Sequence, residues 1–239
     1  MAKIFLACGH GGSDVGAVGK NVYERDLAIS IANQAEKLLK TQKLGKTYVR
    51  VPDSLALTAE VAWINKNLAS ASHDVAINLH FNANAGTPGT GTETWYGHKT
   101  LATEVNTEVA KVLGLKNRGV KRNDLFWFNR SVKCASCILE MGFVNNTKDV
   151  ETIKKNGGLA LAKAIVKASN GTWKNTTPAP APTPVKPPVA PAPVKPVPTP
   201  TPTPKPTPEA PKESEVDVLN KILVLLQGIW ESIKKKFNL

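Results

Sequence analysis

The fold is first indicated by the stretch KIFLACGHGGSDVGAVGK, which runs from Lys3 to Lys20. Its first six residues, Lys3–Cys8, form a short apolar run that ends in glycines. This pattern predicts a buried strand followed by a loop. The loop packs five glycines around a single histidine, His10. Such a loop either cradles a phosphate group or lets the chain turn sharply so that the histidine can act.

Two nucleotide-binding patterns can be tested by their spacing. The P-loop pattern, aligned with its second glycine on Gly19, would have to begin at Asp14 and would lack its final Ser or Thr. The dinucleotide pattern G-x-G-x-x-G, started at Gly9, again meets Asp14 where its third glycine belongs. Both patterns fail, and each places a carboxylate where a phosphate would bind. The second explanation is therefore favoured: the glycines let the chain turn so that His10 can take part in the chemistry.

Beyond this loop, apolar runs of strand length alternate with segments of helical periodicity. This alternation predicts an α/β fold, with a single twisted, largely parallel sheet flanked by helices. Strands are expected at Lys3–Cys8, Lys46–Val51, His73–Leu79, Thr92–Tyr96 and Cys134–Met141, and helices at Glu24–Thr41, Thr58–Ala71, Leu101–Leu113 and Val150–Ala168.

The prolines divide the chain of 239 residues into three segments, because 16 of the 18 lie between Pro178 and Pro211. Residues 1–175 are expected to form the globular domain. Residues 176–213 repeat Pro with Thr, Ala, Val and Lys, which predicts an extended linker in the polyproline II conformation. Residues 214–239 are expected to form a short amphipathic C-terminal helix.

The C-terminal segment carries an apolar seam with the 3, 4, 3, 4 spacing of a coiled coil. The seam consists of Leu219, Ile222, Leu226, Ile229 and Ile233. We expect it to form a homo-oligomer. Adsorption to a membrane surface, with Lys234–Lys236 meeting anionic lipid, and attachment to the cell wall are the alternatives.

The formal net charge of +12 indicates a polyanionic partner. The chain matches no common nucleic-acid-binding motif, so we expect an anionic envelope rather than nucleic acid. The apolar run at the N-terminus, Ile4–Cys8, has five residues, too few for the core of a Sec signal peptide. The three cysteines are too few for a disulfide framework in a chain of this length, and we expect them in the core.

Three segments place polar side chains at or just beyond the carboxyl ends of predicted strands. These side chains are His10, His80 and Glu140. Because sites in α/β sheets gather at the carboxyl ends of strands, we expect the three to converge. Zinc hydrolases commonly hold the ion with two histidines and one carboxylate and leave a position for water. Each histidine taken alone is better explained as an ordinary surface or hydrogen-bonded residue, and it is the occurrence of two in such positions that favours a metal site.

Several short motifs occur in the order found in one known family. They are GHGG followed by D-x-G-A at Gly9–Ala17, YERDLAI at Tyr23–Ile29, NLHFNAN at Asn78–Asn84, GTGTETWY at Gly89–Tyr96, RGVK at Arg118–Lys121 and ILEMGFVNN at Ile138–Asn146. Over about residues 2–169 the chain resembles the zinc-dependent N-acetylmuramoyl-L-alanine amidases of the amidase-3 type. It departs from them at Ala7-Cys8, where the family often has Asp-Pro.

The resemblance implies the roles of the candidate site residues. His10, Glu24 and His80 take the positions of the family's three ligands to Zn²⁺, and Glu140 takes that of its catalytic glutamate. Taken alone, Glu24 is equally an ordinary acidic residue in the first turn of a helix. Asn82, Arg122 and Arg130 are further candidates, for binding an anionic peptide or glycan.

The function that follows is hydrolysis of the amide between N-acetylmuramic acid and L-alanine in peptidoglycan. A phage or prophage endolysin is expected, made in the host cytoplasm without a Sec signal and acting at the cell wall after release. One alternative is a zinc peptidase that cuts within the stem peptide. Another is a non-catalytic wall-binding protein on the same scaffold.

Overall fold

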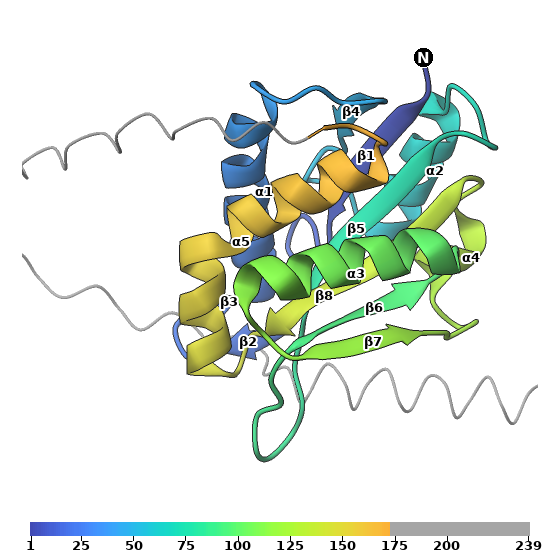
Figure 1. The fold of residues 1–239 in the computed structure, drawn as a ribbon. Coiled ribbons are helices and arrows are strands. Elements are labelled where there is room, and N and C mark those ends of the chain that lie inside the picture. Colours follow the sequence, from blue (N-terminus) through green and yellow to red (C-terminus); the bar gives the residue numbers. More distant parts are fainter. Residues whose placement is uncertain (173–239) are drawn as a thin grey trace, which may run out of the picture. The chain divides into compact units, whose positions relative to one another are not determined.

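The computed structural model describes residues 1–172 and arranges six strands in one twisted sheet (Figure 1). Across the sheet the order is β4 (Thr47–Arg50), β1 (Lys3–Cys8), β5 (Val75–Asn82), β8 (Ala135–Phe143), β6 (Thr92–Tyr96) and β7 (Asn117–Lys121). The first four of these strands are parallel, whereas β6 runs antiparallel to β8 and parallel to β7. The predicted α/β class and largely parallel sheet are confirmed.

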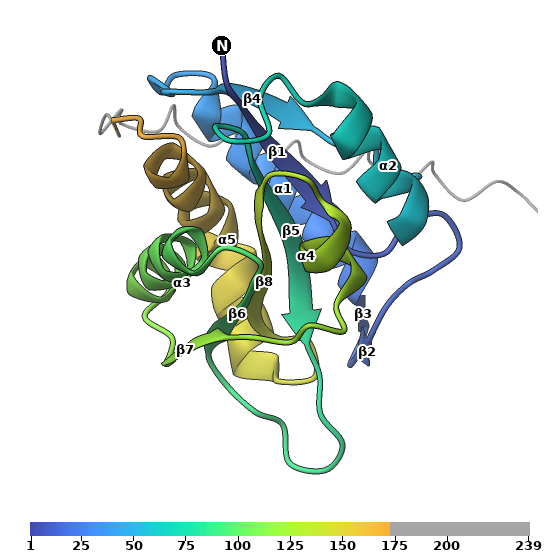
Figure 2. The same ribbon diagram turned by 90° about the vertical axis from the view of Figure 1, so that its right-hand side faces the viewer.

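Helices cover both faces of the sheet (Figure 2). One face carries α1 (Glu24–Leu39), α3 (Lys99–Leu113) and α5 (Thr147–Ala168), which bury the larger apolar core. The other face carries α2 (Leu57–Asn67) and α4 (Trp127–Ser131), with a smaller core. Between α2 and α4, the carboxyl ends of β1, β5 and β8 are left uncovered and line a cavity.

Strand alternation decides which side chains reach the uncovered area. Successive residues of a strand point to opposite faces. In β5, Ile77 and Leu79 enter the larger core, whereas Asn78 and His80 point to the other face and line a cavity there. In β8, Leu139 enters the larger core in the same way, which turns its neighbour Glu140 to the cavity.

The structure extends or corrects several of the predicted elements. The helix expected to reach residue 71 ends at Asn67, because the buried Asp74 carboxylate accepts the backbone N–H groups of Ala69 and Ser70 and holds them in a turn. The strand expected to end at residue 79 continues to residue 82, so His80 lies within it. The short strand pair β2 (Val18–Gly19) and β3 (Val22–Tyr23) was not predicted. Nor were β7 and α4.

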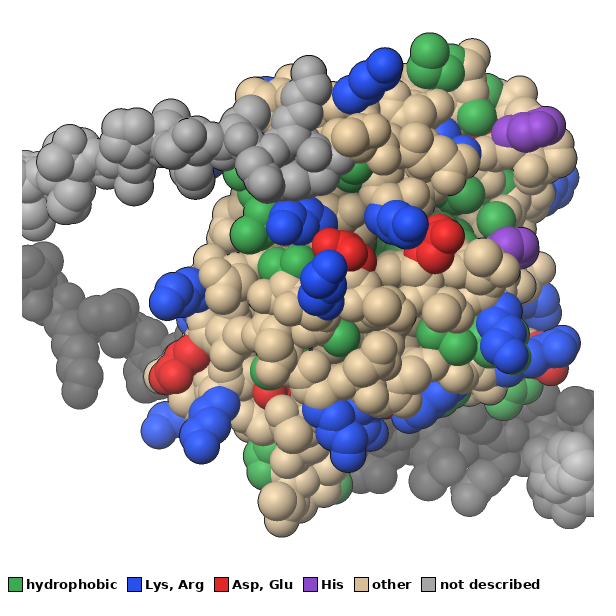
Figure 3. Space-filling view, viewed as in Figure 1, with side chains coloured by type: hydrophobic (Ala, Val, Ile, Leu, Met, Phe, Trp, Pro, Cys, Tyr) green, Lys and Arg blue, Asp and Glu red, His purple; other side chains and the backbone are tan. Residues whose placement is uncertain are grey.

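Lysine and arginine side chains are scattered over the face covered by α1, α3 and α5 (Figure 3). Within residues 1–172, no helix is long and apolar enough to cross a membrane. The predicted linker at residues 176–213 and the predicted helix at residues 214–239 lie outside the described residues.

Candidate active site

The glycine-rich loop after β1 sets the position of His10. The Gly9 N–H donates to the Leu79 carbonyl at 2.7 Å, which ties the end of β1 to β5. His10 then adopts a left-handed backbone conformation, with φ of 66°, that turns its side chain back over the sheet. A Cβ at Gly9 would collide with the His80 ring, and a Cβ at Gly16 would lie 2.7 Å from Oε2 of Glu24. The glycines therefore let the loop pack against the site.

Glu24 is the first residue of α1, and its side chain is buried. The Ala17 N–H donates to Oε2 at 2.8 Å, and the Phe81 N–H donates to Oε1 at 2.9 Å. These two bonds come from the loop before the helix and from β5. The carboxylate is therefore fixed by backbone groups from both sides before any ligand binds.

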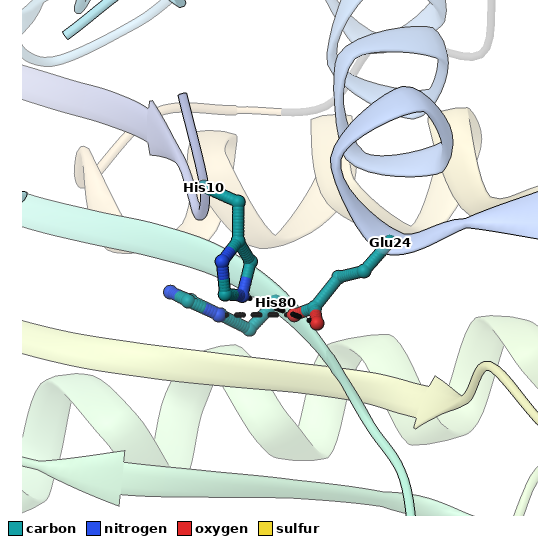
Figure 4. A group of neighbouring side chains, drawn as sticks. All are labelled: His10, Glu24 and His80. Atoms are coloured by element: carbon teal, nitrogen blue, oxygen red, sulfur yellow. Dashed lines mark hydrogen bonds and ion pairs between the residues drawn. The ribbon is translucent and has the colours of Figure 1, made fainter. Parts of the chain in front are cut away.

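The three predicted ligands meet at one point (Figure 4). Nε2 of His10 lies 3.1 Å from Oε2 of Glu24, and Nδ1 of His80 lies 3.0 Å from Oε1. Each residue offers one ligand atom, and the three atoms lie within 4.8 Å of one another. Two imidazole nitrogens and one carboxylate oxygen are the donor set of catalytic zinc sites. The residues therefore fit a metal ion, and His10, Glu24 and His80 could hold one.

Hydrogen bonds within the cluster shift the titration of all three groups. The bond with Glu24 raises the pKa of His10 to about 9. Burial lowers the pKa of His80, but the hydrogen bond with Glu24 and the negative charges of Glu140 and Glu24 together outweigh burial and raise that pKa overall. Burial would raise the pKa of Glu24, but the two histidines hold it well below its usual range. A metal ion would displace protons from the histidines, so its binding releases protons.

Asp14 lies behind His10. Its Oδ2 is 2.7 Å from Nδ1 of His10, the ring nitrogen that faces away from Glu24. A carboxylate in this place fixes the ring orientation and leaves Nε2 for the metal, as carboxylates behind metal-bound histidines commonly do. The residue that breaks both nucleotide-binding patterns thus has a function in orienting the histidine.

Glu140 is next to His80 across the sheet, since the two are register partners of the parallel strands β5 and β8. Its Oε2 is one of the buried side-chain oxygens of residues 1–172 that have no hydrogen-bond partner. Burial raises the pKa of Glu140 to about 7. A carboxylate with an unpaired oxygen and a pKa near neutrality is suited to accept and return a proton.

A cavity of about 520 Å³ opens over these residues. The three candidate ligands and Glu140 line it, and the aromatic side chains of residues 126–128 at α4 form part of its wall. Glu60 of α2 and Asn78 of β5 also line the cavity, and Nδ2 of Asn78 donates to Oε1 of Glu60 at 2.9 Å. Burial raises the pKa of Glu60 to about 8. The cavity therefore combines a polar floor with an apolar side.

The three predicted substrate-binding residues lie in different places. Asn82 lines the cavity, and its Nδ2 donates to Glu93 at 3.0 Å. Arg122 and Arg130 border a separate, smaller cleft, where Arg122 pairs with Asp124 at 2.7 Å and Arg130 stacks over Trp127. The structure therefore brings Asn82 to the candidate site but not the two arginines.

Sequence reasoning missed Glu60, Asn78 and Glu93. Asn78 stands two residues before His80 in the same strand, so the alternation that turns His80 to the cavity turns Asn78 there as well. Glu60 precedes the buried Ile64 by four residues in a helix, which places both on one face. Glu93 alternates with buried threonines in β6. The periodicity of its own element indicates which face each side chain occupies, but not which residues it meets there.

This sheet brings two histidines and a buried carboxylate together beside a second, unpaired carboxylate, an arrangement typical of metal-dependent hydrolases. The sequence profile of the Amidase_3 family, described as N-acetylmuramoyl-L-alanine amidase, matches residues 4–170. The chain belongs to this family.

Individual relatives agree with the family. The N-acetylmuramoyl-L-alanine amidase LytC of Bacillus subtilis (strain 168) is 30% identical over 159 residues, which cover 64% of this chain and 31% of LytC. The endolysin of Bacillus phage SPP1 is 27% identical over 171 residues, covering 66% of this chain and 61% of the endolysin. The chain thus spans less than two thirds of either relative.

Among solved structures, the N-acetylmuramoyl-L-alanine amidase from Clostridium difficile 630 superimposes with a TM-score of 0.61 at 28% identity. The match covers 70% of this chain and 94% of that structure. Residues 4–170 are therefore an N-acetylmuramoyl-L-alanine amidase domain, a hydrolase of the class that cleaves peptidoglycan. The resemblance drawn from the sequence motifs is confirmed at the level of the family.

Proposed function

We propose that this chain hydrolyses the amide between N-acetylmuramic acid and L-alanine in cell-wall peptidoglycan, with Zn²⁺ held by His10, Glu24 and His80. When bound, zinc would supply a Lewis acid that polarises the scissile carbonyl and lowers the pKa of the attacking water. Glu140 takes the proton of that water and returns it to the leaving amine of L-alanine. Asp14 keeps His10 in the orientation that leaves Nε2 for the ion.

The observation that carries this proposal is the register of β5 and β8. It places Glu140 directly beside His80, on the same face of the sheet as the ligand cluster. The unpaired Oε2 of Glu140 leaves an acceptor for the proton of a water in the cavity. A wall-binding protein without catalytic function would not require a buried, unpaired carboxylate, which is costly to maintain.

Digestion of purified cell walls, followed by mass spectrometry of the products, tests the proposal. The zinc-loaded chain should release sugar-free stem peptides that begin with L-alanine, and Glu140→Gln should abolish their release. Glu151→Gln is the matched control, because Glu151 is an exposed carboxylate on α5 outside the cavity. New amines from within the stem would instead identify a zinc peptidase, and full activity of Glu140→Gln would remove Glu140 from the mechanism.

For the biological setting we propose a phage or prophage endolysin. Its similarity to the SPP1 endolysin supports this setting. The chain would be made in the host cytoplasm and reach the wall after a separate protein permeabilises the membrane. This order of events can be tested by expressing the chain in a bacterium whose purified wall it cleaves, with and without a membrane-permeabilising protein. Lysis that depends on permeabilisation supports the proposal, whereas equal lysis in its absence contradicts it.

For residues 214–239 we propose self-association through the seam from Leu219 to Ile233, which would give several catalytic domains avidity for a polymeric wall. Sedimentation velocity of the full chain should show an oligomer that Ile222→Asn combined with Leu226→Asn converts to a monomer. A monomeric wild-type chain at high concentration would contradict the proposal. Flotation with anionic vesicles tests the alternative of membrane adsorption.

A further inference from the structure

A charged cluster lies beside the catalytic face, around Glu93 of β6. The Glu93 side chain is 3% exposed, and its Oε2 accepts from Nε of Arg118 at 2.6 Å and from Nζ of Lys121 at 2.7 Å. Its Oε1 accepts from Nδ2 of Asn82 at 3.0 Å. Both oxygens of the carboxylate are therefore satisfied within the protein. Glu93 cannot itself be a metal ligand or a base without breaking these bonds.

The two cations of the cluster, unlike the carboxylate, keep unused hydrogen-bond donors. The Arg118 and Lys121 side chains are 30% and 37% exposed. Across residues 1–172, neither makes an ion pair with a second acid. Arg118 bonds to Glu93 through Nε alone, so both of its terminal nitrogens remain available. One carboxylate against two cations leaves the cluster with a net charge of +1.

Aromatic rings hold both cations in place. The Arg118 guanidinium lies 5.0 Å from the centre of the Phe143 ring, and the Lys121 ammonium lies 5.3 Å from the centre of the Trp95 ring. Stacking of this kind restricts long side chains that would otherwise move freely. The pair is thus held in position before a ligand arrives, which lowers the cost of binding one.

The sheet register places this cluster at a defined distance from the reacting centre. Glu93 is the register partner of Glu140, which in turn is the partner of His80. The three residues therefore form a row across β6, β8 and β5 on one face, two strand spacings or roughly 10 Å long. Asn82 joins the two parts, because it lines the cavity and also donates to Glu93.

The substrate carries its negative charge on one side only. The glycan is uncharged once its lactyl carboxyl group is bound in the scissile amide, so anionic groups belong to the peptide. An extended residue spans about 3.3–3.6 Å, so roughly 10 Å corresponds to about three residues. A peptide carboxylate within three residues of the scissile bond would therefore reach the cluster. Arg and Lys donors bind such a group through charge-assisted hydrogen bonds.

We propose that Arg118 and Lys121, held by Glu93, form a subsite for a stem-peptide carboxylate and thereby select substrates with a free acid near the scissile amide. This inference rests on the proposed function. Arg118 and Lys121 are then residues that determine specificity. They bind the anionic peptide side of the scissile amide and not the uncharged glycan side.

The test compares two synthetic N-acetylmuramoyl dipeptides that differ only in whether the second residue carries a free α-carboxylate or a carboxamide. The zinc-loaded full chain should cleave the carboxylate substrate with a roughly tenfold higher kcat/KM, expressed mainly in KM. Lys121→Met should bring the ratio of the two kcat/KM values, carboxylate over carboxamide, close to one, and Lys121→Arg should restore the wild-type ratio. Lys116→Met is the matched control, since it removes an exposed lysine nearby and should leave the ratio unchanged.

The outcomes separate the subsite from the proposed function. Equal kcat/KM for both substrates in the wild-type chain, or the wild-type ratio retained in Lys121→Met, overturns the subsite while leaving the amidase activity in place. Failure of the wild-type chain to cleave either substrate at the muramoyl–alanine amide overturns the proposed function as well. Lys121→Met should melt below Lys116→Met, because the buried Glu93 carboxylate loses one of its partners, but circular dichroism should show it folded at the assay temperature, so a lost ratio reports on binding rather than folding.

Discussion

Gly9→Ala should weaken zinc binding strongly while leaving the fold intact. Gly9 does not have a positive φ, so alanine fits the backbone and even reduces the entropy of the unfolded chain, worth about 0.4–1 kcal/mol. Its methyl group, however, would overlap three atoms of the His80 ring. Carbon atoms rest about 3.5 Å apart or more, so the ring would have to move by about 1 Å.

The metal site cannot absorb such a movement. Ligand distances in metal sites tolerate roughly 0.2 Å, and the His80 ring is held 3.0 Å from Glu24. Displacing it would also break a hydrogen bond to a charged group, worth about 1.5–3 kcal/mol. Losing a residue that only hydrogen-bonds a metal ligand lowers metal affinity by up to about 100-fold. Because His80 is itself a ligand, we expect its displacement to lower zinc affinity by more than that.

Calorimetric titration of zinc into the metal-free chain measures this effect, and circular dichroism reports the fold. Gly114→Ala is the control: Gly114 has φ of 65° at the end of α3 and nothing near its Cβ position, so alanine there should cost stability, by about 1 kcal/mol, without affecting zinc. Wild-type zinc affinity in Gly9→Ala would refute the packing of the loop against His80.

Three further predictions concern single carboxylates. Asp14→Ala should weaken zinc binding 10- to 100-fold by calorimetry, because the His10 ring loses the group that orients it; unchanged affinity would contradict that role. Glu140 must be deprotonated to act as a base, and burial raises its pKa to about 7, so kcat/KM should rise with pH up to about that value; a flat profile below pH 7 would contradict this role. Asp74→Ala removes the acceptor of three backbone N–H groups and should lower the free energy of unfolding in urea by about 2–4 kcal/mol. Those bonds hold the pKa of Asp74 below its usual range. The stability that they contribute is therefore present above that range and is lost as the pH falls through the pKa of Asp74 in the folded state. Asp74→Ala should not show this acid-dependent decrease in stability.

The sequence was sufficient for the elements with a strong apolar period. β1, β5 and β8 are almost continuous apolar runs, and their carboxyl ends carry the polar residues that the fold then brings together. β7 was missed because its sequence, NRGVK, contains one apolar residue and no alternation. α4 was missed because five residues do not complete two turns, and its position depends on contacts with the sheet.

The candidate site was only partly readable in the same way. His10, His80 and Glu140 follow from strand ends, whereas Glu24 at the start of α1 resembles an ordinary first-turn acid until the motifs are compared with a family. The cluster of Glu93, Arg118 and Lys121 depends on the register of β6 and β7, which contains an irregularity between Thr92 and Thr94. Local periodicity does not report such a register, because it arises from the packing of the assembled sheet.

The central claim is that one metal ion, held by His10, Glu24 and His80, makes this domain an amidase. Its most direct test is zinc titration of the chelator-stripped full chain, followed by cleavage of purified walls and by the zinc content of the protein. We predict no cleavage without metal, and full recovery that saturates at about one zinc per chain. His80→Ala should bind no stoichiometric zinc and recover no activity. Full cleavage by the stripped wild-type chain would contradict the account.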